Sequence, residues 1–188
     1  MTTFNAIRDK AHAASRAAGW YSNLDGTPKD RNKPEMIALI HSEISEAWAG
    51  FMASAKDDHL PHRLSVEVEL ADVLIRLGDF AGFLDIDVDR WFTSPSHDAW
   101  MMHLRRPGSI ARLFMELHGR ASEMLEDIRK NGPIEIYVST SKTVRTALFI
   151  AYDLKCDIDG AIADKMEYNS RRADHKLEAR AQAGGKAF

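Results

Sequence analysis

The chain has 188 residues, of which 45% are hydrophobic and 28% are charged, and its formal net charge is −3 at pH 7. This length and composition predict a single domain, residues 1–188, with a sizeable core. The nearly balanced charge gives no reason to expect a nucleic acid polymer as partner, and no apolar run reaches the about 20 residues of a membrane span. One cysteine, Cys156, excludes an internal disulfide framework, and the N-terminus lacks a signal-peptide pattern, so we expect a cytoplasmic protein.

In chain order, the apolar periodicity first predicts three helices, over about residues 2–18, 33–55 and 64–84. Each has apolar residues at intervals of three and four, the pattern of a helix with one buried face. Pro34 and Glu35 mark the start of the second helix, because proline and acidic residues favour the first turn. The apolar positions are Phe4, Ile7, Ala11, Ala14 and Ala18, then Ile37, Ile40, Ile44, Ala47 and Phe51, then Val66, Leu70, Val73, Leu77, Phe80 and Leu84.

The second and third helices each carry two carboxylates three residues apart. Residues at this spacing lie on neighbouring turns of one helix face, and all four acidic residues directly precede an apolar position. If the short connection folds the two helices back antiparallel, the carboxylates converge on one site. Such a cluster repels itself unless cations balance it. The pattern therefore predicts a divalent metal site formed by Glu43, Glu46, Glu69 and Asp72.

Two other side chains near this site allow more than one interpretation each. Asp79 follows on the carboxylate side of the third helix and is either a further ligand, a partner that contacts the ligands, or the ion-pair partner of Arg76. Trp20 follows the first helix and either fills the core or stacks on a nucleobase; filling the core is the more common role of an aromatic residue there.

The middle of the chain is less informative. Residues 110–130 and 142–154 are predicted to form helices, and residues 134–138 a short extended stretch. The segment 72–87 has a loose echo in 146–159, since a similar apolar run in both precedes an Asp-Ile-Asp sequence. The echo indicates either an inserted helical hairpin or chance. The second copy has no acidic pair, so we do not expect a second active site there.

The last predicted helix begins near Asp159. Lys165, Asn169 and Arg172 share one of its faces, because they are separated by four and three residues. Two cations and an amide in a row suit the oxygens of a polyphosphate; the alternative is a solvated helix end whose cations favour the dipole. Lys186 follows two glycines in the tail, which either folds over a ligand or frays.

Taken in order, the Glu-x-x-Glu helix, the Glu-x-x-Asp helix and the late Lys-x-x-Tyr-Asn-x-x-Arg segment resemble the MazG-type all-α nucleoside triphosphate pyrophosphohydrolases. The resemblance covers about residues 33–84 and 157–188, and we interpret about 90–145 as a helical insertion. Ser42 departs from the pattern, because the family often has two adjacent glutamates where Ser42 and Glu43 stand. Since Glu43 and Glu46 keep the ligand spacing, we expect the chemistry to survive and the contacts around the ligands to change.

The resemblance implies a helical bundle that hydrolyses nucleoside triphosphates to monophosphates and pyrophosphate with Mg²⁺, or with Mn²⁺ in its place. It implies metal binding by the four acidic residues and a catalytic role for Glu43 or Glu46 in orienting the attacking water. It also implies a homodimer or homotetramer, and stand-alone phage-type members suggest purine deoxynucleotides, dGTP or dATP, as substrates. The triphosphate would be bound by Lys165, Asn169, Arg172 and Lys186.

Two other functions fit the same sequence. In the first, the chain is a non-enzymatic helical interaction module whose acidic rows are solvated surfaces. In the second, it is a bundle with a carboxylate-bridged di-metal centre, although such bundles use Glu-x-x-His pairs and neither acidic helix has one. Within the enzyme interpretation, release of tripolyphosphate or orthophosphate is a further alternative.

Overall fold

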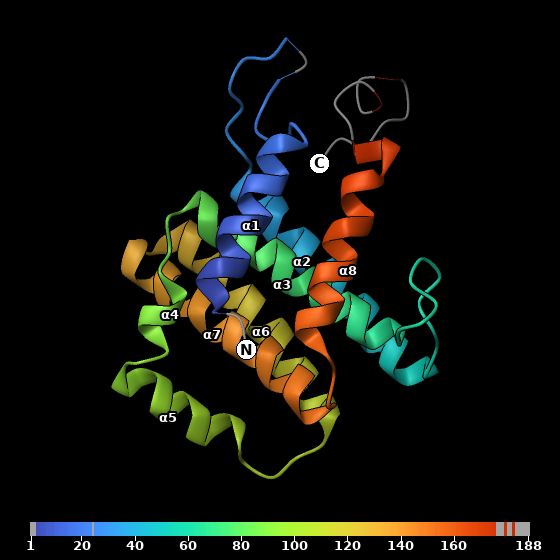
Figure 1. The fold of residues 1–188 in the computed structure, drawn as a ribbon. Helices are drawn as coiled ribbons and strands as arrows, with labels where there is room; N and C mark the ends of the chain where they lie inside the picture. Colours follow the sequence, from blue (N-terminus) through green and yellow to red (C-terminus); the bar gives the residue numbers. More distant parts are fainter. Residues whose placement is uncertain (1–2, 24, 176–178, 180–181, 183–188) are drawn as a thin grey trace.

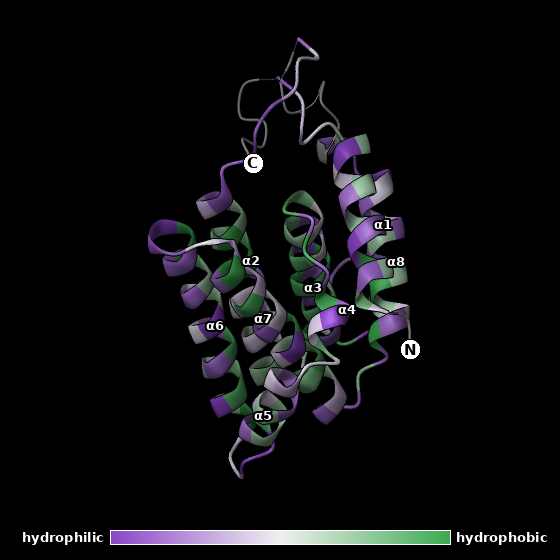
Figure 2. Cartoon of the chain, turned by 90° about the vertical axis from the view of Figure 1, so that its left-hand side faces the viewer, coloured by the Kyte–Doolittle hydropathy of each residue, from purple (hydrophilic) through white to green (hydrophobic). Residues whose placement is uncertain are grey.

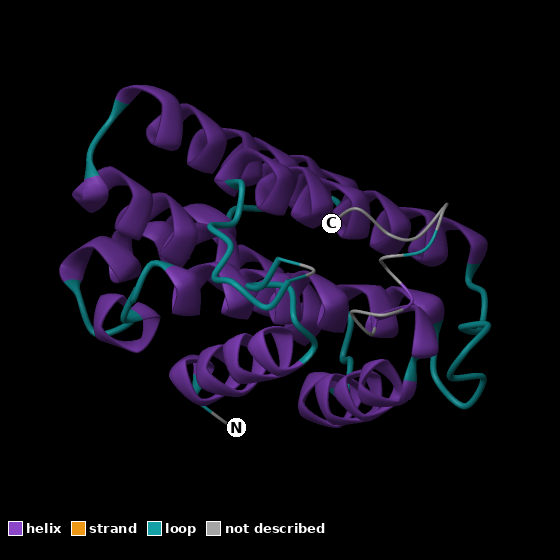
Figure 3. Ribbon diagram, turned by 90° about the horizontal axis from the view of Figure 1, so that it is seen from above, coloured by secondary structure: helices purple, strands orange, loops and turns teal. Residues whose placement is uncertain are grey.

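The chain is an all-α helical bundle in the computed structural model, which describes residues 3–23, 25–175, 179 and 182 (Figure 1). Figure 3 shows no strand in these residues, and their extended pairing is limited to two isolated β-bridges. The predicted fold class is therefore confirmed. No helix in this part of the chain is long and apolar enough to cross a membrane. The elements are α1 (Phe4–Ala17), α2 (Lys33–Ala53), α3 (Ser65–Phe83), α4 (Val88–Trp91), α5 (Pro95–Leu104), α6 (Ile110–Lys130), α7 (Pro133–Asp153), α8 (Ile158–Arg171) and the 3₁₀ helix η1 (Ala173–His175).

α3 is the central helix of the bundle. It packs against α1, α2, α7 and α8, and Figure 2 shows α1 and α8 on one side of it and α2 and α6 on the other. A helix that is apolar around most of its circumference is stable only when other helices cover it. Its buried residues are Val66, Val68, Leu70, Ala71, Val73, Leu74, Leu77, Gly78, Asp79, Phe80 and Ala81.

Local capping explains where α1 and α2 begin. The Asn32 side chain accepts a hydrogen bond from the backbone of Glu35 at 3.2 Å, which satisfies one of the free N–H groups at the start of α2. At the start of α1, the Asp89 carboxylate accepts from the backbone N–H groups of Phe4 at 3.0 Å and Asn5 at 2.9 Å. An anion is favourable at this positive helix end. Asp89 therefore ties α1 to the segment that contains α4.

The prediction of an extended stretch at residues 134–138 is wrong, because α7 runs without a break from Pro133 to Asp153. Proline fits the first turn of a helix, and the Glu135 side chain accepts a hydrogen bond from the backbone of Gly132 at 3.1 Å. Isoleucine and valine favour strands only weakly, and packing readily overrides that preference. Packing of α7 against α6 and α3 favours a helix here.

Candidate metal-binding site

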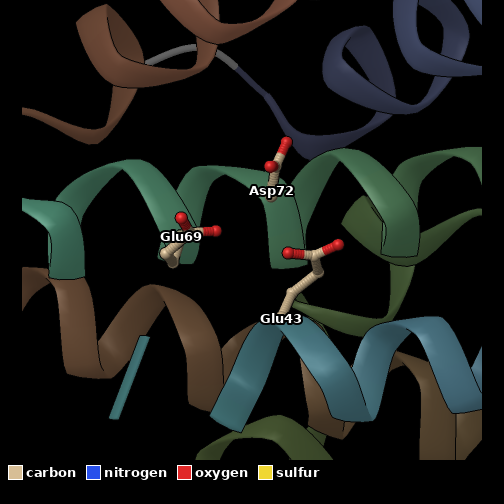
Figure 4. A group of neighbouring side chains, drawn as sticks. All are labelled: Glu43, Glu69 and Asp72. Carbon is tan, nitrogen blue, oxygen red and sulfur yellow. The ribbon is translucent and has the colours of Figure 1, made fainter. Parts of the chain in front are cut away.

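Three carboxylates meet where α2 packs against α3. Glu43 projects from α2 toward Glu69 and Asp72 on α3 (Figure 4), and one oxygen of each lies within 4.8 Å of the others. Each carboxylate flanks a fully buried neighbour; these neighbours are Ile44, Leu70 and Val73 respectively. The apolar residues that join the two helices therefore also bring these three side chains together.

Two cations partly balance this cluster. At 4.8 Å, two full charges repel by about 3.5 kcal/mol for an effective dielectric constant near 20. Lys165 reaches in from α8 and places its Nζ 2.9 Å from Asp72 Oδ2, while Arg76 Nε donates to Glu43 Oε1 at 2.6 Å. Glu69 has no such partner among the described residues. When all three carboxylates are ionised, the cluster therefore carries more negative than positive charge.

The unbalanced charge appears in the pKa values of the cluster. Burial, and then the charges of Asp72, Glu43 and Glu46, raise the pKa of Glu69 to about 8, against the lowering effect of Lys165. Burial also raises the pKa of Asp72. Burial alone would lower the pKa of Lys165, but the Asp72 carboxylate raises it above its ordinary value. Glu69 therefore holds a proton near neutral pH, and a divalent cation would displace that proton on binding.

Glu46, the fourth predicted ligand, lies outside the group of three. Its side chain is exposed, and the Ser42 hydroxyl donates a hydrogen bond to its Oε1 at 3.3 Å. Glu46 nevertheless lines the same cavity as Glu43, Glu69 and Asp72. It is thus placed to act from the open side of the cluster.

The carboxylates form one end of a cavity of about 600 Å³ between α1 and α8. Figure 1 shows these two helices on the same side of the bundle. This volume is typical of a small-molecule site, and the cavity has a charged part and an apolar part. The charged part includes Lys165, Asn169 and Arg172, and the apolar part includes Ala11, Ala14, Ala17, Ala18, Trp20 and Ile75.

The predicted phosphate-binding residues differ in their surroundings. Lys165 forms an ion pair with Asp72. Arg172 forms an ion pair with Asp174, in which Arg172 Nη2 lies 2.7 Å from Asp174 Oδ2. Asn169 Oδ1 is buried and has no hydrogen-bond partner in the described part of the chain. Lys186 lies outside the described residues. Three of the four predicted residues therefore line the cavity.

The surroundings of Asp79, Arg76 and Trp20 differ from those that the sequence favoured. Asp79 is neither in the carboxylate cluster nor paired with Arg76, which binds Glu43 instead. Asp79 Oδ1 accepts a hydrogen bond from the Tyr21 hydroxyl at 2.8 Å and lies 2.9 Å from His12 Nδ1. Trp20 lines the cavity and does not fill the core.

Sequence reasoning also missed α1 as a wall of the cavity. Alanine side chains carry no chemical signal, and only the packing of α1 against α3 brings Ala11, Ala14 and Ala17 beside the acidic residues. Arg31 was missed for the same reason; its guanidinium lies 5.6 Å from the ring centres of Trp20 and Tyr21. Burial and the neighbouring Asp79 carboxylate raise the pKa of Tyr21 well above its ordinary value, so this phenol stays protonated.

Comparison with known proteins identifies no relative of this chain. No protein-family model, curated protein or solved structure matches the chain. The resemblance to the MazG-type enzymes therefore rests on the motifs of residues 33–84 and 157–188. The chemistry of the site is inferred from its own geometry.

Proposed function

We propose that the chain is a Mg²⁺-dependent nucleoside triphosphate pyrophosphohydrolase that cleaves (d)NTPs to (d)NMPs and pyrophosphate. The observation that carries this proposal is a single cavity lined by a cluster of three carboxylates, by two cationic side chains and an amide from α8 and its end, and by an apolar wall. Carboxylate oxygens are the protein ligands that Mg²⁺ prefers, and Mg²⁺ is commonly shared with substrate phosphates.

The residues have distinct roles in this proposal. Glu43, Glu69 and Asp72 hold the metal, and Glu46 either completes the ligand set or orients the attacking water. Bound Mg²⁺ would polarise phosphate oxygens and lower the pKa of water. The water oxygen forms a bond to the α-phosphorus and its proton passes to solvent. The bond from that phosphorus to the bridging oxygen breaks, and pyrophosphate leaves with the electron pair of that bond.

α8 and its end supply the groups that bind the phosphates. Lys165, Asn169 and Arg172 all line the cavity, and cations and amide donors stabilise the negative charge of a triphosphate and of its transition state. The apolar wall that contains Trp20 is suited to the nucleobase. From the resemblance, we further propose a purine deoxynucleotide as substrate and a homodimer or homotetramer as the assembly.

The test is a panel of eight NTPs and dNTPs with Mg²⁺, with products separated by ion-pair chromatography. We expect monophosphate and pyrophosphate in equal amounts. Glu46→Gln should abolish turnover and leave the melting temperature unchanged, whereas Glu35→Gln, on the same helix but outside the cavity, should leave turnover intact. Full activity of Glu46→Gln would contradict its role, and no product with Mg²⁺ or Mn²⁺ would favour the interaction module.

A further inference from the structure

Asp79 lies in the same cavity as the carboxylate cluster but farther along α3. It follows Asp72 by seven residues, which is two helical turns or about 10 Å along the axis. A deoxyribose together with the near part of a purine spans a similar length. A nucleotide whose phosphates lie at the cluster would therefore bring the edge of its base close to Asp79.

The Asp79 carboxylate has one oxygen in use and one available. The residue is 8% exposed, and both of its hydrogen bonds, from the Tyr21 hydroxyl and the His12 ring, go to Oδ1. Oδ2 has no donor among the residues that the structure describes. An ionised carboxylate only accepts hydrogen bonds, and Asp79 lines the cavity, so its second oxygen can accept from a ligand bound there. Oδ2 therefore favours a ligand that brings N–H groups.

The neighbouring side chains hold this carboxylate in place. The His12 ring contacts the Tyr21 ring edge-on, with centres 4.9 Å apart, and the Tyr21 ring lies 5.6 Å from that of Phe83. His12 also packs directly on Gly82, where an added Cβ would lie 2.6 Å from the His12 Cβ. A carboxylate fixed from one side in this way presents its remaining oxygen in a defined position.

We propose that Asp79 determines the base specificity of this site and selects guanine, by accepting hydrogen bonds from the guanine N1–H and the 2-amino group. This inference rests on the proposed function. Guanine presents two adjacent donors on its Watson–Crick edge, whereas adenine, thymine and cytosine each place an acceptor beside their donor. That acceptor would face Oδ2 unfavourably. The substrate class is therefore guanine nucleoside triphosphates.

The experiment measures binding and turnover separately. Binding of dGMP, dIMP and dAMP is measured by calorimetry, and kcat/KM is measured for dGTP, dITP and dATP. We expect dGMP to bind about ten-fold or more tightly than dIMP, which lacks the 2-amino group, and dAMP to bind more weakly still. Asp79→Asn should remove this preference and favour the xanthine nucleotide, whose 2-carbonyl accepts from the new amide.

Asp85→Asn is the matched control, because Asp85 is exposed just beyond the same helix and has a positive φ of 53° that asparagine also adopts. It should keep the guanine preference. An equal loss for all bases in Asp79→Asn would overturn the proposal and leave Asp79 a purely structural role. If Asp79→Asn does not fold, equal binding of dGMP and dIMP by the wild type overturns it. Selective binding of dGMP without hydrolysis would support the guanine site and contradict the proposed reaction.

Discussion

The α2–α3 and α6–α7 hairpins are built alike, although only the first carries the carboxylates. Both α3 and α7 are followed by a residue with positive φ, 53° at Asp85 and 59° at Lys155. In both, the next backbone N–H donates to a carbonyl of the helix, at 2.8 Å in the first and 2.9 Å in the second, and an aspartate then caps the following helix. The two helix ends are thus a repeat in structure, with Asp85 aligned to Lys155. This register matches residues 72–87 to 142–157 and differs from the sequence echo, whose two Asp-Ile-Asp sequences do not align in it.

The helix that follows each hairpin packs against the other hairpin. α4, after the first hairpin, packs on α7, and α8, after the second, packs on α3. This exchange explains how Lys165, far from Asp72 in the sequence, comes within 2.9 Å of it. The second hairpin therefore contributes to the site through the helix that follows it.

The polar residues of the two hairpins differ in how they are satisfied. When the two helix ends are aligned, Glu69 corresponds to Ser139 and Asp72 to Lys142. The Ser139 hydroxyl donates to a carbonyl of its own helix at 3.3 Å, and the nearby Thr143 hydroxyl does so at 2.7 Å, so neither needs an external partner. A carboxylate cannot donate to a carbonyl of its own helix in this way unless it is protonated, and in its ionised form it needs a cation. The comparison shows that a candidate metal site forms in the hairpin whose polar side chains cannot make their hydrogen bonds within their own helix.

The largest effect should come from removing the cation that α8 supplies. Lys165→Met breaks a buried ion pair, so we expect the metal-free protein to lose about 3–5 kcal/mol of stability, measured by urea unfolding. Mg²⁺ should restore part of this loss, because it also neutralises the carboxylates. Lys142→Met is the control in the other hairpin, where the ammonium lies 5.5 Å from the Trp100 ring centre and should contribute only about 0.5–1 kcal/mol. Equal losses in the two variants would contradict the comparison.

A smaller change in free energy is expected when Glu69 is substituted, and almost no change in hydrolysis when its counterpart Ser139 is substituted. Glu69→Gln should lower kcat/KM for triphosphate hydrolysis by about 10²–10³-fold, the usual effect of removing one group that stabilises the transition state. Its melting temperature without metal should not fall, because Glu69, with a pKa of about 8, is already largely protonated at pH 7. Ser139→Ala should leave kcat/KM unchanged and cost about 1 kcal/mol of stability. A loss of hydrolysis in Ser139→Ala would place the chemistry elsewhere.

The pH dependence of the metal-free protein tests Glu69 without a change of sequence. The pKa of Glu69 is about 8 in the folded chain, against an ordinary value of 4.5, so between these pH values the folded state binds more protons than the unfolded state. Stability should therefore fall as pH rises from about 4.5 to 8. The measurement is the urea midpoint in EDTA across this range for the wild type and Glu69→Gln, whose profile should be flatter. Identical profiles would show that Glu69 does not titrate in this window.

Much of the local structure follows from the sequence alone. The intervals of three and four predict α2, α3 and α6 closely, because helical periodicity is a property of neighbouring residues. The position of Glu43, Glu69 and Asp72 beside the apolar stripes follows from the same periodicity. The approach of these three carboxylates is therefore predictable from the order of residues along the chain.

The tertiary structure alone decided the partners of the polar groups. Arg76 binds Glu43, and Asp79 binds Tyr21 and His12, because α1 packs against α3 and the loop after α1 returns over it. Residue spacing along the chain does not encode such long-range contacts. The same packing set α1 as a wall of the cavity, and the packing of α7 made residues 134–138 helical. The sequence determined which faces carry the carboxylates, and the packing of distant helices determined what faces them.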